Sequence, residues 1–404
     1  MKILFFSQYF WPENLPVNFV AKTLIETGFE VDIITGKPNY PKGNFFEGYK
    51  GFGFVKEDLN SIKIFRVPIF SRGQGSLFRL GLNYFSYILS SCFFSLFLLR
   101  GRRHDCIFIY GTSPIFQAIP AILLSKIRKI PVILWVQDLW PHSFYLATGG
   151  RFKMLNKIVE LLTRLSYKGA DLILVQSESF VGEISKYSNE VKILYLPNTV
   201  DKVFEEKIKS STVNIDSLQT GFTVVFAGNL GFAQNLDVII NAAESLIPYS
   251  DIKVILIGDG SQRNYVLQQK RIRSLDNLFI EGSYPLENMP EILSQASCLL
   301  ISLIDDSILS LTVPNKLQAY LASGKPIIGC IGGEAAKIIE LSKSGFTCDP
   351  SKSDALFLTI LKLYNLSEAE RKKMGRNAAK YYKDNFSSDI FAIKLSEAIK
   401  RLLR

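Results

Sequence analysis

The sequence lacks the short motifs that mark most cofactor and metal chemistry. Residues 7–14, which follow the first strand-like run, read SQYFWPEN and contain none of the glycines of a G-x-G-x-x-G turn, so a nicotinamide or flavin dinucleotide is not expected. No Walker lysine loop, G-x-S-x-G elbow or D-x-D pair occurs, and Asp305-Asp306 stands alone on a predicted loop. We therefore predict no metal or other cofactor, and a bound diphosphate would be neutralised by Lys, Arg and backbone N–H groups.

Cysteine and histidine are also scarce. The five cysteines are odd in number, far apart and without C-x-x-C or zinc-ligand spacing, which predicts buried thiols in a reducing cytosol. Only two histidines are present, so an active site in this chain uses few imidazoles. The first residues, MKILFF, have no long apolar core or small-residue cleavage site, and they predict a β-strand rather than a signal peptide.

The composition is that of a large folded protein. The 404 residues suit two domains of about 200 residues each, and 48% hydrophobic with 21% charged residues indicates little disorder. Lys and Arg outnumber Asp and Glu by 47 to 37, a net charge of +10, which favours nucleotide phosphates or an anionic membrane surface as partners. The basic residues are scattered and form no nucleic-acid motif, so nucleic acid is not an expected partner.

Strand-like apolar runs alternate with helical patterns along the chain. This alternation predicts an α/β fold of two doubly wound, Rossmann-like domains that face each other across a cleft. We expect an N-terminal domain at 1–200, a polar linker at 201–221, a second domain at 222–385, and an amphipathic helix at 386–404 that packs back on the first domain. Strands are predicted at 2–6, 30–35, 62–67, 106–110, 131–136, 171–175, 191–195, 222–226, 252–257, 277–280, 297–301 and 326–330. Helices are predicted at 17–27, 78–99, 115–127, 153–167, 178–187, 235–246, 262–271, 287–294, 315–323 and 334–341, and through most of the last fifty residues.

One uncharged segment, residues 80–99, is long enough to cross a membrane and is followed by an arginine cluster at 100–103. A single span would place the strands at 2–6 and 106–110 on opposite sides of the membrane, although one sheet should contain both. We therefore favour a helix in the core or in a surface groove. A helix that also lies on the membrane surface is the alternative, and a true span is the least favoured interpretation.

The most informative stretch is residues 312–328, which read TVPNKLQAYLASGKPII. Pro314 suits the first turn of a helix, Gly324 suits the position just past its end, and apolar residues recur between them at helical spacing. The N-terminus of this helix should point at the carboxyl edge of a sheet, where its free N–H groups and partial positive charge suit a phosphate. Four residues form this predicted anion site: Val313, Pro314, Asn315 and the cationic Lys316.

Glycine-bearing turns follow several strands of the second domain, and glycine lets the backbone approach a ligand closely. The turn at 228–235 has an ordinary tight turn as its alternative interpretation, and the G-D-G turn at 258–260 is expected to be largely structural. Residues 332–334 either cap a helix or form a second anion site. The residues predicted to contact a nucleotide in these turns are Gly228, Asn229, Gln234, Gly282 and Ser283.

Polar residues also follow two strands of the first domain. Residues 136–143 read VQDLWPHS and contain Asp138 together with one of the two histidines, His142. Either Asp138 caps a helix while the neighbouring tryptophan packs, or Asp138 lies at the mouth of the cleft. We assign four further residues to the acceptor or sugar side: Glu13, Asn14, Gln137 and His142.

These motifs, in this order, resemble the retaining family-4 glycosyltransferases of the GT-B fold. The segment 312–328 is similar to their P-S-K-x-x-E-Y-x-A-x-G-K-P pattern, and residues 138–143 resemble the D-L-W-P-x-S signature of sugar transferases for O-antigen, colanic-acid and fucosamine-type polysaccharides. The chain departs from the family at Ala319, where many members have a glutamate, and at Gln137, where many have a histidine. Asn229 and Gln234 stand where the family usually has an Arg and a Lys, so Lys316 is expected to neutralise most of the diphosphate charge.

The resemblance implies transfer of a sugar from a UDP-sugar to a lipid-linked saccharide, with retention, in O-antigen or capsule synthesis. The subfamily suggests an N-acetylated deoxyhexose such as N-acetyl-L-fucosamine. The catalytic residues it implies are Asp138 and Lys316, and Gln318 stands in for the missing glutamate at the ribose. It also implies a cytoplasmic protein attached peripherally to the inner face of the membrane. Two alternatives stay open: a non-catalytic partner in a synthesis complex, and a two-domain sugar-binding protein.

Overall fold

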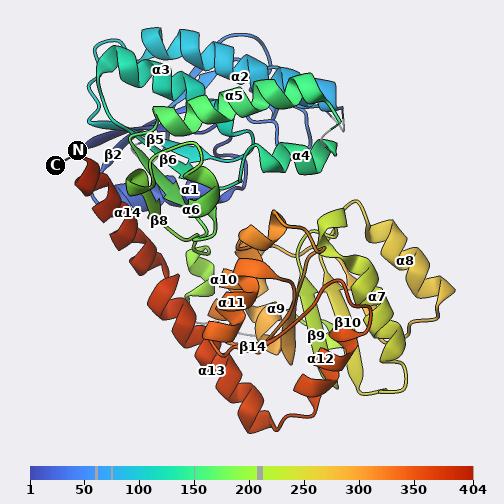
Figure 1. The fold of residues 1–404 in the computed structure, drawn as a ribbon. Coiled ribbons are helices and arrows are strands. Elements are labelled where there is room, and N and C mark those ends of the chain that lie inside the picture. Colours follow the sequence, from blue (N-terminus) through green and yellow to red (C-terminus); the bar gives the residue numbers. More distant parts are fainter. Residues whose placement is uncertain (60–61, 74–75, 150, 207–212, 404) are drawn as a thin grey trace. The chain divides into compact units, whose positions relative to one another are not determined.

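The computed structural model describes residues 1–59, 62–73, 76–149, 151–206 and 213–403 (Figure 1). The chain forms two compact units, one of Met1–Pro197 with Ala392–Arg404 and one of Asn198–Phe391. The predicted linker at 201–221 falls in the second unit, and its residues 207–212 lie outside the described part of the chain.

The first unit is built on an eight-stranded sheet. Its strands are β1 (Lys2–Phe6), β2 (Glu30–Gly36), β3 (Val55–Leu59), β4 (Ile62–Val67), β5 (Cys106–Gly111), β6 (Val132–Val136), β7 (Leu172–Val175) and β8 (Ile193–Tyr195). Their order is β3-β4-β2-β1-β5-β6-β7-β8, and all neighbours are parallel except the antiparallel pair β3 and β4. The order reverses between β1 and β5, which is the Rossmann switch point.

The helices of the first unit connect these parallel strands. They are α1 (Pro16–Glu26), α2 (Leu77–Leu98), α3 (Ile119–Arg128), α4 (His142–Thr148), α5 (Lys153–Gly169) and the short α6 (Phe180–Ile184). The uncharged segment predicted at 80–99 is α2, a crossover between β4 and β5. Because β1 pairs with β5, both ends of α2 feed the same sheet, which supports the argument against a single span. Only 28% of its most apolar window is buried, so α2 is not a core helix as the favoured interpretation expected.

The second unit is built on a six-stranded, fully parallel sheet of order β11-β10-β9-β12-β13-β14. The strands are β9 (Phe222–Ala227), β10 (Ile252–Ile257), β11 (Leu278–Glu281), β12 (Cys298–Ser302), β13 (Ile327–Cys330) and β14 (Gly345–Cys348). The helices are α7 (Leu236–Ser245), α8 (Arg263–Ile272), α9 (Met289–Gln295), α10 (Asn315–Ala322), α11 (Gly333–Leu341), α12 (Ala355–Tyr364), α13 (Glu368–Asn385) and α14 (Ser388–Leu403), the last entering the first unit from Ala392. The two Rossmann-like sheets confirm the predicted fold class.

Burial explains why the strands of the second unit are continuous apolar runs. Alternate residues of β9 point to opposite faces, so Val225 joins one buried cluster with α10 and α11, while Val224 joins another with α7 and α12. All five cysteines are free thiols, and three of them are buried as predicted, whereas Cys92 and Cys348 are only partly buried. Helices on both faces hold the carboxyl edge of the sheet rigid, which is the edge where ligands bind in such folds.

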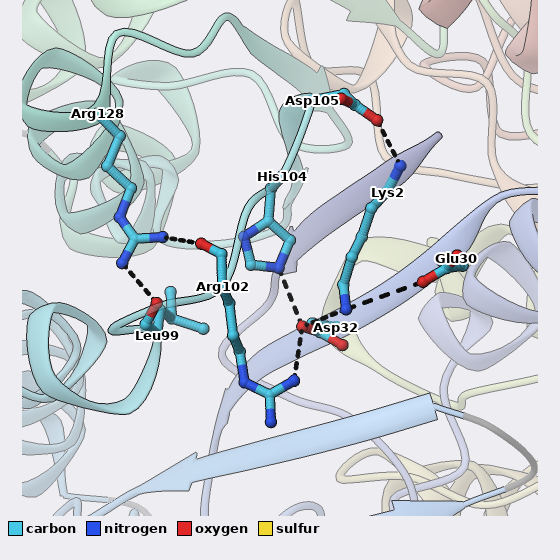
Figure 2. A network of polar contacts seen from close by, with 8 residues as sticks. All are labelled: Lys2, Glu30, Asp32, Leu99, Arg102, His104, Asp105 and Arg128. Carbon is cyan, nitrogen blue, oxygen red and sulfur yellow. Dashed lines mark hydrogen bonds and ion pairs between the residues drawn. The ribbon is translucent and has the colours of Figure 1, made fainter.

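A charged network stabilises the amino edge of the first sheet. Figure 2 shows the side chain of Asp32 receiving contacts from His104 Nε2 at 3.0 Å, Lys2 Nζ at 3.1 Å and Arg102 Nη1 at 3.5 Å. Burial acts to raise the pKa of Asp32, but the hydrogen bonds from His104 and Lys2 outweigh it and hold that pKa below its usual value. Arg128 ties the same region together by donating to the carbonyls of Leu99 and Arg102.

We expect Asp32→Asn to lower the free energy of unfolding by about 1.5–3 kcal/mol, the range for hydrogen bonds to charged groups. The folded-state pKa is depressed, so the contribution is present above the usual pKa of aspartate, about 3.9, and is lost as the pH falls through the folded value. Urea unfolding at several pH values measures both effects. Asp105→Asn is the control, because Asp105 lies in the same network at an exposed position and should cost less. Equal losses in the two variants would contradict a dominant role for Asp32.

Candidate active site

The carboxyl edge of the second sheet brings together most of the predicted nucleotide-binding residues. The strand order reverses between β9 and β12, and the turn after β9 and the helix α10 both flank this switch point. Lys316, on the first turn of α10, donates a hydrogen bond from Nζ to Gln234 Oε1. Its Nζ also lies 3.7 Å from the centre of the Phe226 ring. The structure therefore pairs two predicted donor residues that are far apart in sequence.

Burial changes the chemistry of Lys316. It lowers the pKa of the ammonium group to about 7, and no described acidic side chain lies within ion-pair distance of Nζ. A partly buried ammonium group without an anionic partner loses part of its hydration, and a bound anion would offset that cost. Near neutral pH, the charged and neutral forms of the Lys316 amine are therefore both populated in the free protein.

Gly228 makes room for this lysine. Its φ is +138°, and a Cβ built on it would lie 2.7 Å from Lys316 Cε. The strand that leads to Gly228 is held by Tyr320 of α10, whose hydroxyl accepts from Ala227 N at 2.8 Å. The end of β10 and the turn that follows it also hold the Gly228 turn in place. Gly228 N donates to Ile257 O at 2.8 Å, and Leu230 N donates to Asp259 O at 2.8 Å. The lysine stem and the glycine backbone are therefore in direct contact.

We expect Gly228→Ala to weaken UDP binding at least tenfold and to lower the melting temperature. The added methyl group must displace the Lys316 stem, and a non-glycine residue at this φ costs about 1–3 kcal/mol. Calorimetric titration with UDP and thermal unfolding measure the two effects. Gly332→Ala is the control, because a Cβ there meets no atom within 4 Å and the φ of Gly332 is −100°. Unchanged UDP binding in Gly228→Ala would contradict the close contact.

The N-terminus of α10 has the features of an anion site. Pro314 occupies the N-cap position with extended backbone rather than the first turn, and no side chain caps the helix. Its first N–H groups therefore lack a side-chain acceptor. Asn315 is exposed and accepts from Asn198 Nδ2 at 2.9 Å, whereas Val313 is buried in the core. Gly324 has the positive φ, +64°, expected just past the helix end.

Gln318 lies on the buried face of α10. Its side chain is fully buried, and with the amide nitrogen turned toward the helix N-terminus it donates to Pro314 O at 3.0 Å and Asn315 O at 3.2 Å. These bonds stabilise the turn that carries Lys316. A contact between Gln318 and a ribose remains a prediction. To make it, the Gln318 amide would have to break its bonds to Pro314 O and Asn315 O and bond the ribose hydroxyls instead.

The other predicted donor residues lie on the surface of the same edge. Asn229, Gly282 and Ser283 are exposed, and Gly282 O accepts from Gly258 N at 3.1 Å. Gly333 opens α11 with a φ of +70°, and a Cβ there would lie 1.9 Å from Ser310 O. Their contacts with a nucleotide stay predictions.

In the first unit, Asp138 links two loops at the carboxyl edge of the sheet. Its Oδ2 accepts from Ser113 N at 2.8 Å and from Ser113 Oγ at 2.7 Å, and Ser113 Oγ also accepts from Trp140 Nε1 at 3.1 Å. Burial raises the pKa of Asp138, although the bonds from Ser113 act in the opposite direction. Among the described residues only Ser113 hydrogen-bonds this carboxylate, so Oδ1 is available to a ligand.

The other residues predicted on the acceptor side differ in burial and in hydrogen bonding. Gln137 Nε2 and His142 Nδ1 are buried and have no hydrogen-bond partner within the described ranges. Asn14 is exposed. Glu13 is buried, with Oε1 accepting from the backbone N–H groups of Asn39 and Tyr40 at 2.7 Å each. Glu13 therefore holds two loops in place, and its contact with an acceptor stays a prediction.

Sequence reasoning missed Arg72, which lies beyond the carboxyl end of β4. Its guanidinium stacks on Tyr40, 5.2 Å from the ring centre, and lies 3.4 Å from the Tyr9 hydroxyl through Nη1. No described acidic side chain forms an ion pair with it. The only sequence signal is a basic residue shortly after a strand, which is too common to be informative. Arg72 adds a cation near Asp138, because the Tyr84 hydroxyl interacts with Arg72, Tyr9 and Asp138.

The described residues contain no group of three or more His, Cys, Asp or Glu side chains that could hold a metal ion. Each unit therefore has its own group of candidate residues. The second unit has a lysine at a helix N-terminus that no side chain caps, and the first has a carboxylate and an arginine that forms no ion pair with a described acidic side chain.

Two Rossmann-like units with sites at their carboxyl edges define the GT-B class of glycosyltransferases. Residues 17–199 match the model of the glycosyl transferase 4-like domain, and residues 221–365 match that of glycosyl transferases group 1. The two models together cover most of the chain in the order of such enzymes, and the protein belongs to these glycosyltransferases. No curated protein matches the sequence.

Solved structures with the same fold cover almost the whole chain. Alr3699/HepE from Anabaena, crystallised with UDP, is 14% identical with a TM-score of 0.70, covering 99% of this chain and 100% of its own. Sucrose-phosphate synthase from Thermosynechococcus elongatus is 14% identical with a TM-score of 0.74, covering 99% and 98%. WaaG, a glycosyltransferase involved in lipopolysaccharide biosynthesis, is 13% identical with a TM-score of 0.66, covering 98% of each chain. At these identities the similarity establishes the fold.

Proposed function

We propose that this glycosyltransferase moves a sugar from a UDP-sugar to a lipid-linked saccharide, with retention at the anomeric carbon, in O-antigen or capsule synthesis. The proposed donor sugar is an N-acetylated deoxyhexose such as N-acetyl-L-fucosamine. The proposed location is cytoplasmic, on the inner face of the membrane. UDP in the HepE structure and the lipopolysaccharide role of WaaG support the donor and the pathway class by analogy of fold.

The observation that carries the proposal is Lys316. It is partly buried without an acidic partner among the described side chains, at a helix N-terminus that no side chain caps, beside a glycine that brings the backbone close. A diphosphate would supply the missing anion and would accept hydrogen bonds from the first N–H groups of α10. Gln234 and Asn229 would add neutral hydrogen bonds where the family usually has cations.

In the proposed reaction the bond between the anomeric carbon and the diphosphate oxygen breaks while positive charge develops on the sugar ring. Lys316 and the α10 N–H groups stabilise the negative charge that collects on the departing diphosphate. The acceptor hydroxyl forms the new bond on the same face and gives its proton to the departing phosphate oxygen. No strong external base is needed, which suits a chain with two histidines.

The first unit would supply the acceptor contacts. Asp138 Oδ1, Gln137 Nε2 and His142 Nδ1 have no partner among the described residues and could hydrogen-bond sugar hydroxyls. Arg72, also without an acidic partner there, would bind an anionic group such as the phosphate of a lipid-linked acceptor. We propose that these groups hold the acceptor in position for attack.

A thermal-shift screen across UDP-, GDP-, ADP- and CMP-sugars tests the donor assignment. We expect stabilisation by UDP and by one UDP-sugar in particular, because only a ligand that binds the folded state raises the melting temperature. Transfer to a lipid-linked saccharide, followed by NMR of the product, then tests acceptor and retention. Stabilisation by another nucleotide alone would overturn the donor, and an inverted product would overturn the stereochemistry.

A further inference from the structure

Helix α2 is amphipathic in the opposite sense to an ordinary core helix. The residues that face the sheet are polar or carry a hydroxyl, and they are fully or almost fully buried: Asn83, Tyr87, Ser91 and Ser95. The residues on the outer face are large and apolar, and each is more than half exposed: Phe78, Phe85, Leu89, Phe93 and Phe97. Only 28% of its most apolar window is buried. A water-facing helix would place these two sets the other way round.

Helix α5 also exposes an apolar stripe, although its inner face is mixed. Its inner face carries Val159, Thr163, Ser166 and Tyr167, all buried. Its outer face carries Met154, Ile158, Leu161 and Leu165, which recur at helical spacing and are between 47% and 78% exposed. Two helices far apart in sequence therefore expose apolar stripes.

The two stripes belong to one layer. Helix α3 contacts both α2 and α5, and it also exposes Leu123 and Ile127. Figure 1 shows α2, α3 and α5 together on one side of the first sheet. We call this the outer helical face. An exposed apolar surface of this extent marks an interaction site in a folded protein.

The charge around the outer helical face is strongly positive. Residues 77–170 contain twelve Lys and Arg but three Asp and Glu, a net +9 in a chain whose total is +10. On α5, Lys157, Arg164 and Lys168 are exposed and follow the same helical spacing one residue from the apolar stripe, so they border it. The sequence made the basic residues look scattered, but the fold places these three beside the apolar surface.

We propose that the outer helical face docks on an anionic lipid bilayer. Its apolar side chains would enter the boundary between headgroups and acyl chains, and its lysines and arginines would meet the headgroup phosphates. The helices lie on the bilayer without crossing it, because β4 and β5 at the two ends of α2 belong to one sheet. The inference deepens the proposed function, because a lipid-linked acceptor would be reached from this surface, but lipid binding itself does not depend on transfer activity.

Charge favours lipid over a second copy of the chain. In a two-fold dimer the same face would meet itself, bringing two sets of lysines and arginines together with few acids to neutralise them. An anionic bilayer provides apolar area and negative charge at once. Exposed phenylalanines such as Phe78 and Phe97 are typical of the apolar face that such helices insert into the headgroup–acyl boundary.

Vesicle flotation of the full-length protein tests the proposal. We expect binding to vesicles of equal parts phosphatidylcholine and phosphatidylglycerol, at least tenfold weaker binding to phosphatidylcholine alone, and loss of binding at high salt. Ile158→Glu with Leu161→Glu should abolish flotation. Lys157→Gln with Lys168→Gln should weaken it about fivefold per charge.

The control replaces apolar residues of the second unit that are even more exposed, Ile272→Glu with Leu341→Glu, and should float like the parent. Thermal unfolding checks that each variant folds; if the double glutamate variant does not fold, the lysine pair still decides the result. Transfer to a soluble short-chain acceptor should persist in the α5 variants, which separates a failure of docking from a failure of the proposed function. No binding to anionic vesicles, equal binding to neutral ones, or a dimer that Ile158→Glu dissociates in sedimentation would overturn the proposal.

Discussion

Replacing Lys316 by alanine is expected to abolish sugar transfer and to weaken UDP binding by about 1.5–3 kcal/mol, the range for hydrogen bonds to charged groups. The reason is that Lys316 is the one basic side chain that the structure places at the uncapped N-terminus of α10 among the described residues of this turn. Asn229 and Gln234 can donate hydrogen bonds but cannot neutralise a departing diphosphate. Calorimetric titration and a transfer assay measure the two effects.

The matched control is Lys325→Ala. Lys325 lies just past the other end of α10, and burial lowers its pKa as well. A general cost of removing a partly buried lysine would affect both variants, whereas loss of UDP affinity should be confined to Lys316→Ala. Unchanged turnover in Lys316→Ala would remove this residue from the mechanism.

The pKa of Lys316 also predicts how UDP binding depends on pH. With a pKa of about 7 in the free protein, the lysine is charged below pH 7 and mostly neutral above it. A bound diphosphate favours the charged form, so binding above pH 7 must take up a proton, and affinity should fall up to about tenfold per pH unit. Lys316→Ala should bind UDP weakly with no such dependence.

Replacing Asp138 by asparagine is expected to lower kcat about 10²-fold, the cost of holding a reacting group out of position. Asparagine preserves the shape and can still accept from Ser113, but it loses the charge that attracts a sugar or acceptor hydroxyl. Because the proposed diphosphate contacts lie in the other unit, UDP affinity should stay within twofold of the parent. Steady-state kinetics with varied acceptor and a UDP titration separate these effects.

Asp171→Asn provides the control for Asp138. Asp171 Oδ2 accepts from Val132 N at 2.8 Å, so it also bonds a backbone N–H beside β6, but at the amino end of the strand. If Asp138 only linked two loops, both variants would lose stability and Asp138→Asn would keep its turnover. That result would favour the interpretation of Asp138 as a structural residue.

Local patterns predicted most of the secondary structure. Continuous apolar runs mark the buried parallel strands, and every strand predicted from such a run is present within a few residues. Strand β3 was missed because it reads VKEDL and lies exposed at the antiparallel edge, where burial does not shape the sequence. Strand β14 was missed because it begins with glycine and is only half-buried. The helix predicted at 178–187 is only Phe180–Ile184.

For the predicted site, too, some features follow from local sequence patterns and others depend on contacts between distant segments. Lys316 and the helix that carries it were predicted from a local pattern, since proline, glycine and helical spacing all act within one turn or two. The contact of Lys316 with Gln234, Phe226 and Gly228 joins segments that are about 80 to 90 residues apart, which no local pattern predicts. Spacing alone also could not tell that Gln318 faces the core.

Local patterns show that this protein is an α/β chain of two Rossmann-like units with one exceptional cation, Lys316. Burial and backbone geometry impose residue types at fixed local spacing, so these features are visible without coordinates. Which side of each helix meets the sheet depends on packing against distant strands, because helical periodicity defines two faces but does not say which one points inward. For α2 and α5 that packing leaves an apolar stripe facing outward.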